Sequence, residues 1–309
     1  MSVMISGSIA YDNILHYSGR FSDQFVAESL DHINLTFVTD SMIRNYGGCA
    51  ANIAYGLKML GGDPILTGAV GTDGSEYLWR LEEMLGIKTS VAKFNDCFTA
   101  QCFVTTDQTG AQLATFNPGA MLRSHEAPFP EGDIELAIVA PDCKRAMVER
   151  MNACAKKGIP VLFDIGQGVS QFEGSEIPAL VEKATWMAAS TYEMDLIARK
   201  SGLTAADIVK RVKALVVTDG EKGAVLYEGD RQVHIPACHV ENALYPVGAG
   251  DAFRAGLIFG LTKGWDWVKI VRAACVTASF KVQSPGAQNF KFTAEEFAAR
   301  YEATYGEAL

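Results

Sequence analysis

Short apolar runs alternate with amphipathic helical patterns along most of this 309-residue chain. Runs that are too short for helices predict buried strands at residues 3–7, 64–70, 134–140, 160–164, 185–189 and 215–218. Apolar residues at helical spacing predict a helix over residues 52–60, which Gly61 and Gly62 end, and another over residues 74–85. Because strands and helices alternate, we expect right-handed parallel crossovers and therefore a doubly wound α/β sandwich.

Two segments break this alternation, roughly residues 14–45 and 89–119. Within them, residues 33–38 and 101–105 alternate between polar and apolar as half-buried strands do, and residues 107–110 suit a hairpin turn. Two insertions of this kind predict a small β-sheet that covers the open edge of a site as a lid. Ordinary extension of the sheet edge is the alternative. The α/β core would consist of residues 1–13, 46–88 and 120–309.

The composition is that of an ordinary globular protein, with 49% hydrophobic and 20% charged residues. The net charge of −9 argues against nucleic acid as a partner, because binding to a phosphate backbone requires a basic surface. An acidic chain is still compatible with a nucleotide ligand, since a small phosphate group needs only a local cluster of backbone N–H donors. The composition says little more.

No stretch approaches the roughly eighteen consecutive apolar residues of a membrane span, and no basic residue precedes the short apolar run at the N-terminus. The seven cysteines are scattered along the chain and never form a Cys-x-x-Cys pair. Such a set is typical of reduced thiols rather than of a disulfide framework or a zinc site. We therefore expect a cytoplasmic protein with no membrane partner.

The segment Gly248-Ala249-Gly250-Asp251 places small residues before an aspartate at the start of an apolar helical pattern. Glycines at a helix N-terminus let successive backbone N–H groups point at one spot, where the helix dipole also favours negative charge. Gly248, Ala249 and Gly250 are therefore predicted to hold the transferred phosphoryl group. Asp251 would accept the proton of an attacking hydroxyl. The structural alternative is an aspartate that caps the helix.

Two common nucleotide-binding motifs are missing from the chain. No Gly-Lys dipeptide occurs, so there is no Walker A loop. Phe253 stands where a dinucleotide fingerprint that begins at Gly248 requires its third glycine. These absences disfavour a P-loop enzyme and a Rossmann dehydrogenase.

A second glycine-rich helix start lies near the N-terminus, where Gly47 and Gly48 precede Asn52. The glycines permit a ligand to approach the backbone closely, and the Asn52 amide offers a donor and an acceptor to hydroxyl groups. Asp12 follows the first predicted strand, at the edge where parallel α/β sheets bind ligands, and its carboxylate suits two neighbouring sugar hydroxyls. Helix packing for the glycines and a turn for Asp12 are the alternatives.

Together these motifs resemble the ribokinase-like (PfkB) family of sugar and nucleoside kinases. The family pattern pairs Gly47-Gly48-x-x-x-Asn52-x-Ala54 with residues 248–253, and residues 71–74 match the run after its second core strand. Residues 218–224 are similar to a turn of the family that lines ATP, which implies an ATP site formed by Thr218, Gly220 and Gly223. The resemblance runs to about residue 290 and implies a three-layer α/β/α sandwich with a small β-sheet lid.

Within that family, residues 7–14 and 163–167 look most like broad-specificity prokaryotic nucleoside kinases. This likeness implies an ATP-dependent enzyme that phosphorylates the 5′-hydroxyl of a nucleoside such as adenosine. The nucleobase would stack under the lid. The implied substrate site has Asp12 on the ribose hydroxyls, beside Gly47, Gly48, Asn52 and Gln167.

The family also uses Mg²⁺, which bridges the nucleotide phosphates and neutralises developing charge. Residues 190–193 (Ser-Thr-Tyr-Glu) align with the family's Asn-x-x-Glu, so the resemblance implies that Glu193 and Asp164 lie near the metal. Where ribokinase-like members have an Asp-Thr-Thr run that helps to hold a monovalent cation, this chain has Tyr245-Pro246-Val247. Dependence on K⁺ therefore stays open.

Two other functions stay open at this point. One is a sugar kinase of the same family, acting on ribose or fructose. The other is a catalytically silent nucleoside- or sugar-binding protein, against which Asp251 argues, because a pure binder needs no base beside a phosphate site. Monomer and homodimer are both open.

Overall fold

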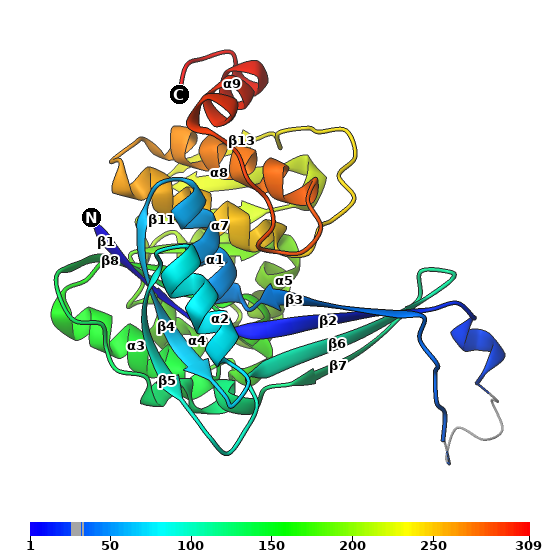
Figure 1. The fold of residues 1–309 in the computed structure, drawn as a ribbon. Helices are drawn as coiled ribbons and strands as arrows, with labels where there is room; N and C mark the ends of the chain where they lie inside the picture. Colours follow the sequence, from blue (N-terminus) through cyan, green and yellow to red (C-terminus); the bar gives the residue numbers. More distant parts are fainter. Residues whose placement is uncertain (26–31, 33) are drawn as a thin grey trace.

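The computed structural model describes residues 1–25, 32 and 34–309, which form two β-sheets of unequal size (Figure 1). The larger sheet has nine strands in the order β13-β12-β11-β10-β9-β8-β1-β4-β5. From β5 to β11 neighbouring strands run parallel, and β12 and β13 add an antiparallel hairpin at one edge. Its strands are β1 (Ser2–Ser6), β4 (Asp63–Val70), β5 (Lys88–Lys93), β8 (Ile134–Val139), β9 (Val161–Phe163), β10 (Trp186–Ser190), β11 (Ala214–Thr218), β12 (Ala224–Glu228) and β13 (Arg231–Ile235).

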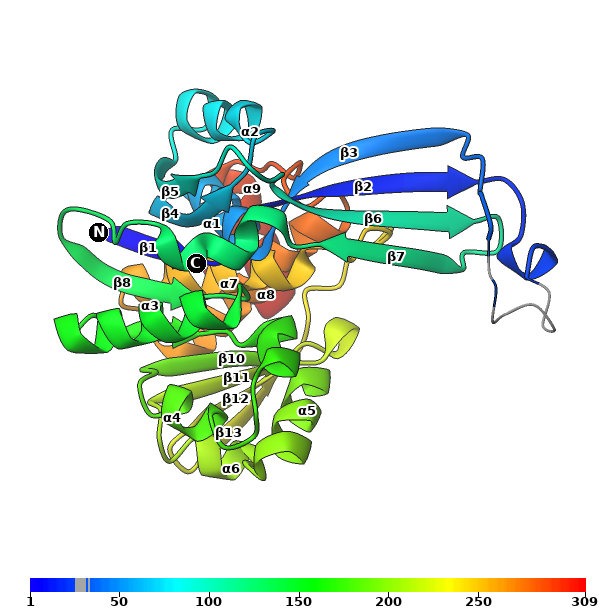
Figure 2. The same ribbon diagram turned by 90° about the horizontal axis from the view of Figure 1, so that it is seen from below.

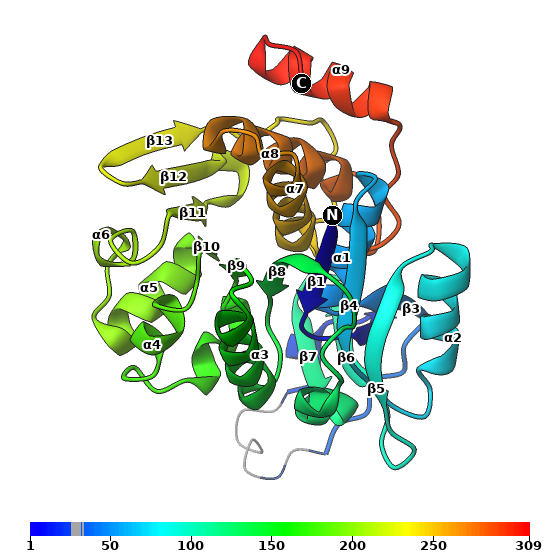
Figure 3. The same ribbon diagram turned by 90° about the vertical axis from the view of Figure 1, so that its left-hand side faces the viewer.

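Helices cover both faces of the large sheet, as the alternating pattern predicts (Figure 3). One face carries α1 (Cys49–Met59), α7 (Ala249–Thr262) and α8 (Trp267–Val282), with α9 (Ala294–Tyr305) outside them. The other face carries α3 (Lys144–Lys157), α4 (Ile177–Val181), α5 (Thr191–Ser201) and α6 (Ala205–Ile208). Because both faces are enclosed, the central strands are apolar throughout, and the core forms two main clusters, one under each helical layer. The predicted three-layer α/β/α sandwich is confirmed.

One further helix, α2 (Ser75–Trp79), lies beside β5 and continues into a π-helical turn over Arg80–Met84. Short 3-10 turns occur at residues 21–23, 119–126, 166–171 and 220–222. No helix in the described part of the chain is long and apolar enough to cross a membrane.

The smaller sheet has four strands in the spatial order β3 (Ser41–Gly47), β2 (Ala10–Tyr17), β6 (Ala100–Asp107) and β7 (Gln112–Asn117). It projects from one end of the sandwich, and its far end stands clear of the helices (Figure 2). Parallel pairing of β2 with β6 joins its two halves, which are far apart in the sequence. A small second sheet built from two distant segments is therefore present, as predicted.

Two predicted boundaries of this sheet differ from the structure. Residues 88–93 form β5, which pairs with β4 at the edge of the large sheet, so the second insertion does not begin at residue 89. The alternating polarity of this segment reflects a half-buried edge strand of the core. In addition, β2 begins at Ala10, which places Asp12 and Asn13 in the small sheet rather than in the core.

The strand predicted over residues 33–38 is wrong for residues 34–38, which have no regular structure. The reason is register: β3 pairs with β2 only from Ser41 onward, so the residues before it have no ladder partner. Ile33 lies outside the described residues. The hairpin turn predicted at residues 107–110 is present, closed by a hydrogen bond of 3.0 Å from Gly110 N to Asp107 O.

The end of β1 organises the edge at which the small sheet meets the sandwich. Ser8 follows β1 and accepts hydrogen bonds from the first turn of α1, through Oγ from Cys49 N at 3.0 Å and through its carbonyl from Ala50 N at 3.1 Å. Helix α7 packs against α1 along the same face. The carboxyl ends of the parallel strands therefore share one edge with the N-termini of α1 and α7.

Candidate active site

Asp251 lies in the first turn of α7. The helix begins at Ala249, and its N-cap is Gly248 at φ +82°, where an added Cβ would also come within 2.7 Å of Ala287 Cβ. No side chain accepts a capping hydrogen bond at this helix end. The alternative interpretation of Asp251 as a helix cap is therefore wrong, and its carboxylate is left for another role.

The Asp251 carboxylate is partly buried against α1, where its Oδ2 accepts a hydrogen bond of 2.8 Å from Asn52 Nδ2. Burial raises the pKa of Asp251 to about 7. The hydrogen bond from Asn52 lowers this pKa, and the charge of Asp164 raises it further. A carboxyl group that titrates near neutrality is suited to take a proton from a hydroxyl.

Two backbone N–H groups at the start of α7 are available to a ligand. Gly250 and Asp251 lie in the first turn, where N–H groups have no acceptor within the helix. The N–H of Ala249, by contrast, donates to Pro246 O at 3.0 Å. Ala249 lines the same cavity as Gly250, so a phosphate contact of its N–H stays a prediction and would require this hydrogen bond to be exchanged. The positive end of the helix dipole adds to the attraction for an anion.

A cavity of about 400 Å³ opens beside this helix end. Gly250 lines it, together with the three residues predicted for ATP, namely Thr218, Gly220 and Gly223. Gly223 has φ +99°, and an added Cβ would lie 2.1 Å from Ile235 O, so only glycine lets this turn pack against β13. Further walls are apolar and come from Ala237, Val240, Phe253 and Val282. A mainly apolar cavity that reaches free N–H groups suits a nucleotide.

Asp12 stands on β2 with its carboxylate against Gly47, where an added Cβ would lie 2.4 Å from Asp12 Oδ2. Gly48 caps α1 at φ +90°, and an added Cβ there would lie 2.5 Å from Ala10 N. Burial raises the pKa of Asp12, and the charge of Asp12 in turn raises the pKa of Asp251. The structure thus brings together the predicted residues around both glycine-rich helix starts.

Comparison with known proteins shows the family. The family model of the pfkB family carbohydrate kinases matches residues 24–294. The chain belongs to this family. It is similar to a nucleoside kinase of Methanocaldococcus jannaschii, with 30% identity over 90% of this chain and 92% of the relative. It is also similar to fructokinase-2 of Oryza sativa subsp. japonica, with 27% identity over 70% of this chain and 71% of the relative.

Two solved structures of Burkholderia thailandensis nucleoside kinase resemble this pfkB kinase closely. One is in complex with inosine and the other with ADP-inosine, and both are 39% identical to this chain. Their TM-scores are 0.88 and 0.86, and the matches cover 100% of this chain and 99% and 97% of theirs. The predicted family and ribokinase-like fold are confirmed, and the protein is a phosphotransferase with an alcohol acceptor, as predicted.

The two carboxylates predicted near magnesium both face Arg254 in this pfkB kinase. Arg254 Nε and Nη2 donate to the two oxygens of Asp164 at 3.0 and 3.2 Å, and Nη2 lies 3.7 Å from Glu193 Oε2. The guanidinium thus orients Asp164 through both oxygens, and the role of Asp164 near a metal stays a prediction. Glu193 Oε2 accepts from Ser190 N in the capping box of α5, which leaves Oε1 for a metal-bound water.

Other acidic or metal-ligating side chains do not complete a protein-only metal centre. Within residues 1–25, 32 and 34–309, no group of three or more histidine, cysteine, aspartate or glutamate side chains is arranged to hold a metal ion.

Lys281 contacts residues 245–247, which stand in place of the family's monovalent-cation motif. Its side chain is fully buried, and Nζ donates to Tyr245 O at 2.7 Å and to Ser284 O at 3.0 Å. Burial lowers the pKa of Lys281 to about 8, and the negative charge of Asp251 opposes this shift. A side-chain ammonium thus connects the segment before α7 to the segment after α8.

Sequence reasoning missed Arg254 and Gln288 and included Gln167. Arg254 lies one helical turn after Asp251, so helical spacing would have placed it beside the site. Gln288 follows α8 in no recognisable motif, and only the fold brings it to Asn52. Gln167 is exposed on the 3-10 turn after β9, so its substrate role stays a prediction.

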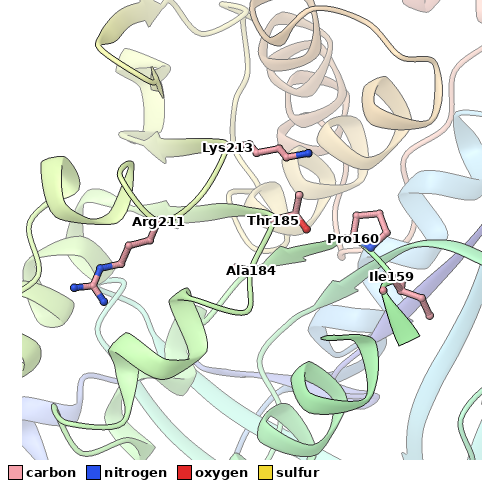
Figure 4. Close-up of a pocket in the computed structure, with 7 residues that line it drawn as sticks. Ile159, Pro160, Ala184, Thr185, Arg211 and Lys213 are labelled. Atoms are coloured by element: carbon pink, nitrogen blue, oxygen red, sulfur yellow. The ribbon is translucent and has the colours of Figure 1, made fainter. Parts of the chain in front are cut away.

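A second, more open hollow lies away from these residues (Figure 4). Its volume is about 530 Å³, and Pro160, Thr185 and Lys213 line it just before β9, β10 and β11 begin. It is therefore at the amino ends of the strands, opposite the edge at which α/β sheets bind ligands. None of the predicted site residues lines it.

Proposed function

We propose that this pfkB kinase transfers the γ-phosphoryl group of ATP to the 5′-hydroxyl of a nucleoside, with adenosine and inosine as the first substrates to test. The observation that carries the proposal is the position of Asp251. It follows Gly250, which lines the predicted ATP cavity, and its carboxylate accepts a hydrogen bond from Asn52 on α1, whose N-cap Gly48 packs against β2, the strand of Asp12. One residue is thus next to both predicted substrates.

Asp251 acts as the base of the transfer. Its carboxylate accepts the proton of the 5′-hydroxyl while that oxygen bonds to the γ-phosphorus and the bond from this phosphorus to the bridging oxygen breaks, which releases ADP. The free N–H groups of Gly250 and Asp251 stabilise the charge on the phosphoryl oxygens. Mg²⁺ would neutralise part of the phosphate charge when bound, and Oε1 of Glu193 would accept a hydrogen bond from one of its waters.

The surface beside Asp12 favours a nucleoside over a simple sugar. Asp12 pairs with Cys102 across β2 and β6, and Ile14 pairs with Val104, so these four side chains share one face of the small sheet. The carboxylate, which would accept hydrogen bonds from ribose hydroxyls, thus lies beside an apolar surface on which a nucleobase can lie. A free sugar has no group for that surface. The inosine complex of the Burkholderia relative supports the same choice.

The test is ATP consumption by the purified protein against a panel of nucleosides and sugars. We expect adenosine or inosine to support turnover with a far higher kcat/KM than ribose or fructose. Turnover with a sugar alone would instead support the sugar-kinase alternative. Binding of a nucleoside with no ATP consumption in the presence of Mg²⁺ would support the non-catalytic alternative.

A further inference from the structure

A chain of hydrogen bonds from distant parts of the sequence ends on Asp251. Arg80 Nη1 donates to Gln288 Oε1 at 2.7 Å, and Gln288 Nε2 donates to Asn52 Oδ1 at 2.9 Å. Asn52 Nδ2 then donates to Asp251 Oδ2 at 2.8 Å. Arg80 begins the π-helical turn after α2, and Gln288 lies between α8 and α9. Two segments outside the glycine-rich motifs are thus connected to the predicted base.

The direction of these hydrogen bonds follows from the chemistry of the first donor. A guanidinium can only donate, so Gln288 presents its carbonyl oxygen to Arg80 and its NH₂ group to Asn52. Asn52 must then accept through Oδ1 and direct its own NH₂ group to Asp251. Reversal of either amide would bring two carbonyl oxygens or two N–H groups into opposition. The arginine therefore determines the orientation of both amides.

Tyr77 constrains the Gln288 amide a second time. The Tyr77 hydroxyl donates to Gly47 O at 2.7 Å, so it accepts from Gln288 Nε2 at 2.5 Å. Exposed fractions are 0% for Tyr77, 2% for Gln288 and 6% for Asn52. At this depth water is a poor substitute for a lost partner, so the network resists rearrangement.

We propose that Gln288 is a positioning residue for phosphoryl transfer, which holds the Asn52 amide so that its NH₂ group stabilises Asp251 as a carboxylate. The proposal rests on the proposed function in that Asp251 is the base. With the amide held, an ionised Asp251 always faces a donor. With the amide free to rotate, Asn52 Oδ1 can face the carboxyl group and favour the protonated form, which cannot accept the proton of the substrate.

Other charged and titratable groups around Asp251 also influence its ionisation. They come from each element packed around it: Asp12 on β2, Cys49 on α1, Asp164 after β9, Arg254 on α7 and Lys281 on α8. The two aspartates raise the pKa of Asp251 and the arginine lowers it. Replacement of Gln288 by a neutral residue leaves all five groups in place, so any change can be assigned to the amide network.

The test is the pH dependence of kcat/KM for Gln288→Met, which removes the donor to Asn52 without a change in charge. We expect the acidic limb of this pH profile to shift to higher pH by about one unit, because Asp251 loses a hydrogen bond that favours its ionised form. Activity should recover towards the wild-type value at high pH. Arg80→Met should move the limb in the same direction, whereas Arg80→Lys, which still only donates, should restore it.

Asn289→Ala is the matched control, since Asn289 is the exposed neighbour of Gln288 and, among the described residues, its side chain donates only to Pro285 O in its own loop. Its acidic limb should coincide with that of the wild type. The positioning role would be overturned if folded Gln288→Met and Arg80→Met kept the acidic limb of the wild-type pH profile. Their loss of activity would then appear only as a higher KM, or would be equal at all pH values. If the wild type uses only a sugar, the proposed nucleoside function fails, while the limb measured with that sugar still tests Gln288.

Discussion

At the scale of single residues, burial gives Asp251 both its chemistry and a cost in stability. Its pKa of about 7 is well above the ordinary value for aspartate because the carboxylate is enclosed beside Asp164. Between the ordinary pKa and about pH 7, the folded protein holds a proton that the unfolded chain has released. The free energy of unfolding therefore falls as pH rises through this window and levels off above it.

Asp251→Asn should relieve this cost. The asparagine carbonyl can still accept from Asn52 Nδ2, and no charge is buried at high pH. We expect nearly equal melting temperatures for wild type and variant at pH 5, and a variant that melts roughly several degrees higher at pH 8.5. Differential scanning calorimetry at the two pH values measures this. A difference independent of pH would show that Asp251 is not raised in pKa by the fold.

We expect Asp12 to bind the ribose hydroxyls of the nucleoside. Asp12→Ala should raise KM for the nucleoside by roughly ten- to a hundredfold, since hydrogen bonds from hydroxyls to a charged carboxylate are lost. Wild type should prefer ribonucleosides to 2′-deoxynucleosides, and the variant should lose most of this preference. Steady-state kinetics with adenosine and 2′-deoxyadenosine provide the measurement. Equal use of the two by the wild type would rule out the ribose clamp.

The sequence was enough to predict those site residues whose position depends on their neighbours in the chain. Asp251 follows a glycine at a helix start, and Asn52 follows Gly48 in the same way, so local geometry made both predictable. Gln288 was out of reach because its partners come from α1 and α2 and depend on tertiary packing. The hydrogen bond from Ala249 N to Pro246 O was equally out of reach, because it depends on the conformation of the loop before α7.

At the scale of elements, Asp73 ties the small sheet to the sandwich. Its carboxylate follows β4 and accepts hydrogen bonds from Thr99 N at 2.8 Å, Arg44 Nη2 at 2.7 Å and Gln101 Nε2 at 3.0 Å. These donors lie in or just before β3 and β6, at the base of the small sheet. The far end of the sheet stands clear of the sandwich (Figure 2). Among the described residues, these contacts attach the base of the sheet to the sandwich.

This attachment supports the prediction that the small sheet acts as a lid over the nucleoside. We expect amides around Phe37 and in β6 around Phe103 to exchange hydrogen more slowly when adenosine is saturating, because a closed lid excludes water from the phosphate. Amides of α3, on the opposite helical layer, serve as the control. Hydrogen-exchange mass spectrometry with and without adenosine gives the answer. Equal exchange in both lid segments would show a fixed sheet.

The contact of Lys281 with the segment before α7 bears on the open question of K⁺. Its ammonium already binds Tyr245 O and Ser284 O, so we expect equal activity in potassium and in tetramethylammonium buffers. Lys281→Ala should lose activity, and K⁺ or NH₄⁺ should restore part of it by taking the place of the ammonium. A wild-type enzyme that is inactive without K⁺ would contradict this assignment.

Strands that are buried on both faces were predicted correctly, whereas half-buried strands at sheet edges were assigned to the wrong sheet or given the wrong bounds. The buried strands β1, β4 and β8 are apolar on both faces, so their short runs were unambiguous. An alternating pattern only shows that a segment is half-buried, which is true of β5 in the large sheet and of β6 in the small one. Which sheet such a strand joins depends on pairing across long sequence distances.

At the scale of the whole molecule, the parallel sheet explains why the predicted sites for both substrates lie close together. Strands that run in one direction bring their following segments to one edge, and the starts of α1 and α7 meet there through Asn52 and Asp251. The small sheet continues from β1 at this edge and contributes Asp12. The sandwich followed from alternation of elements, whereas the meeting of the two helix starts followed only from their packing.

Asp251 is the proposed base in the transfer of a phosphoryl group from ATP to a nucleoside. The most direct measurement is formation of nucleoside 5′-monophosphate from ATP, Mg²⁺ and adenosine or inosine, by wild type and by Asp251→Asn, with binding of the nucleoside measured in parallel. We predict product with the wild type, a rate lower by roughly a hundredfold or more with the variant, and similar nucleoside binding by both. Wild-type turnover in a folded Asp251→Asn protein, or phosphate on a hydroxyl other than the 5′-hydroxyl, would contradict the account.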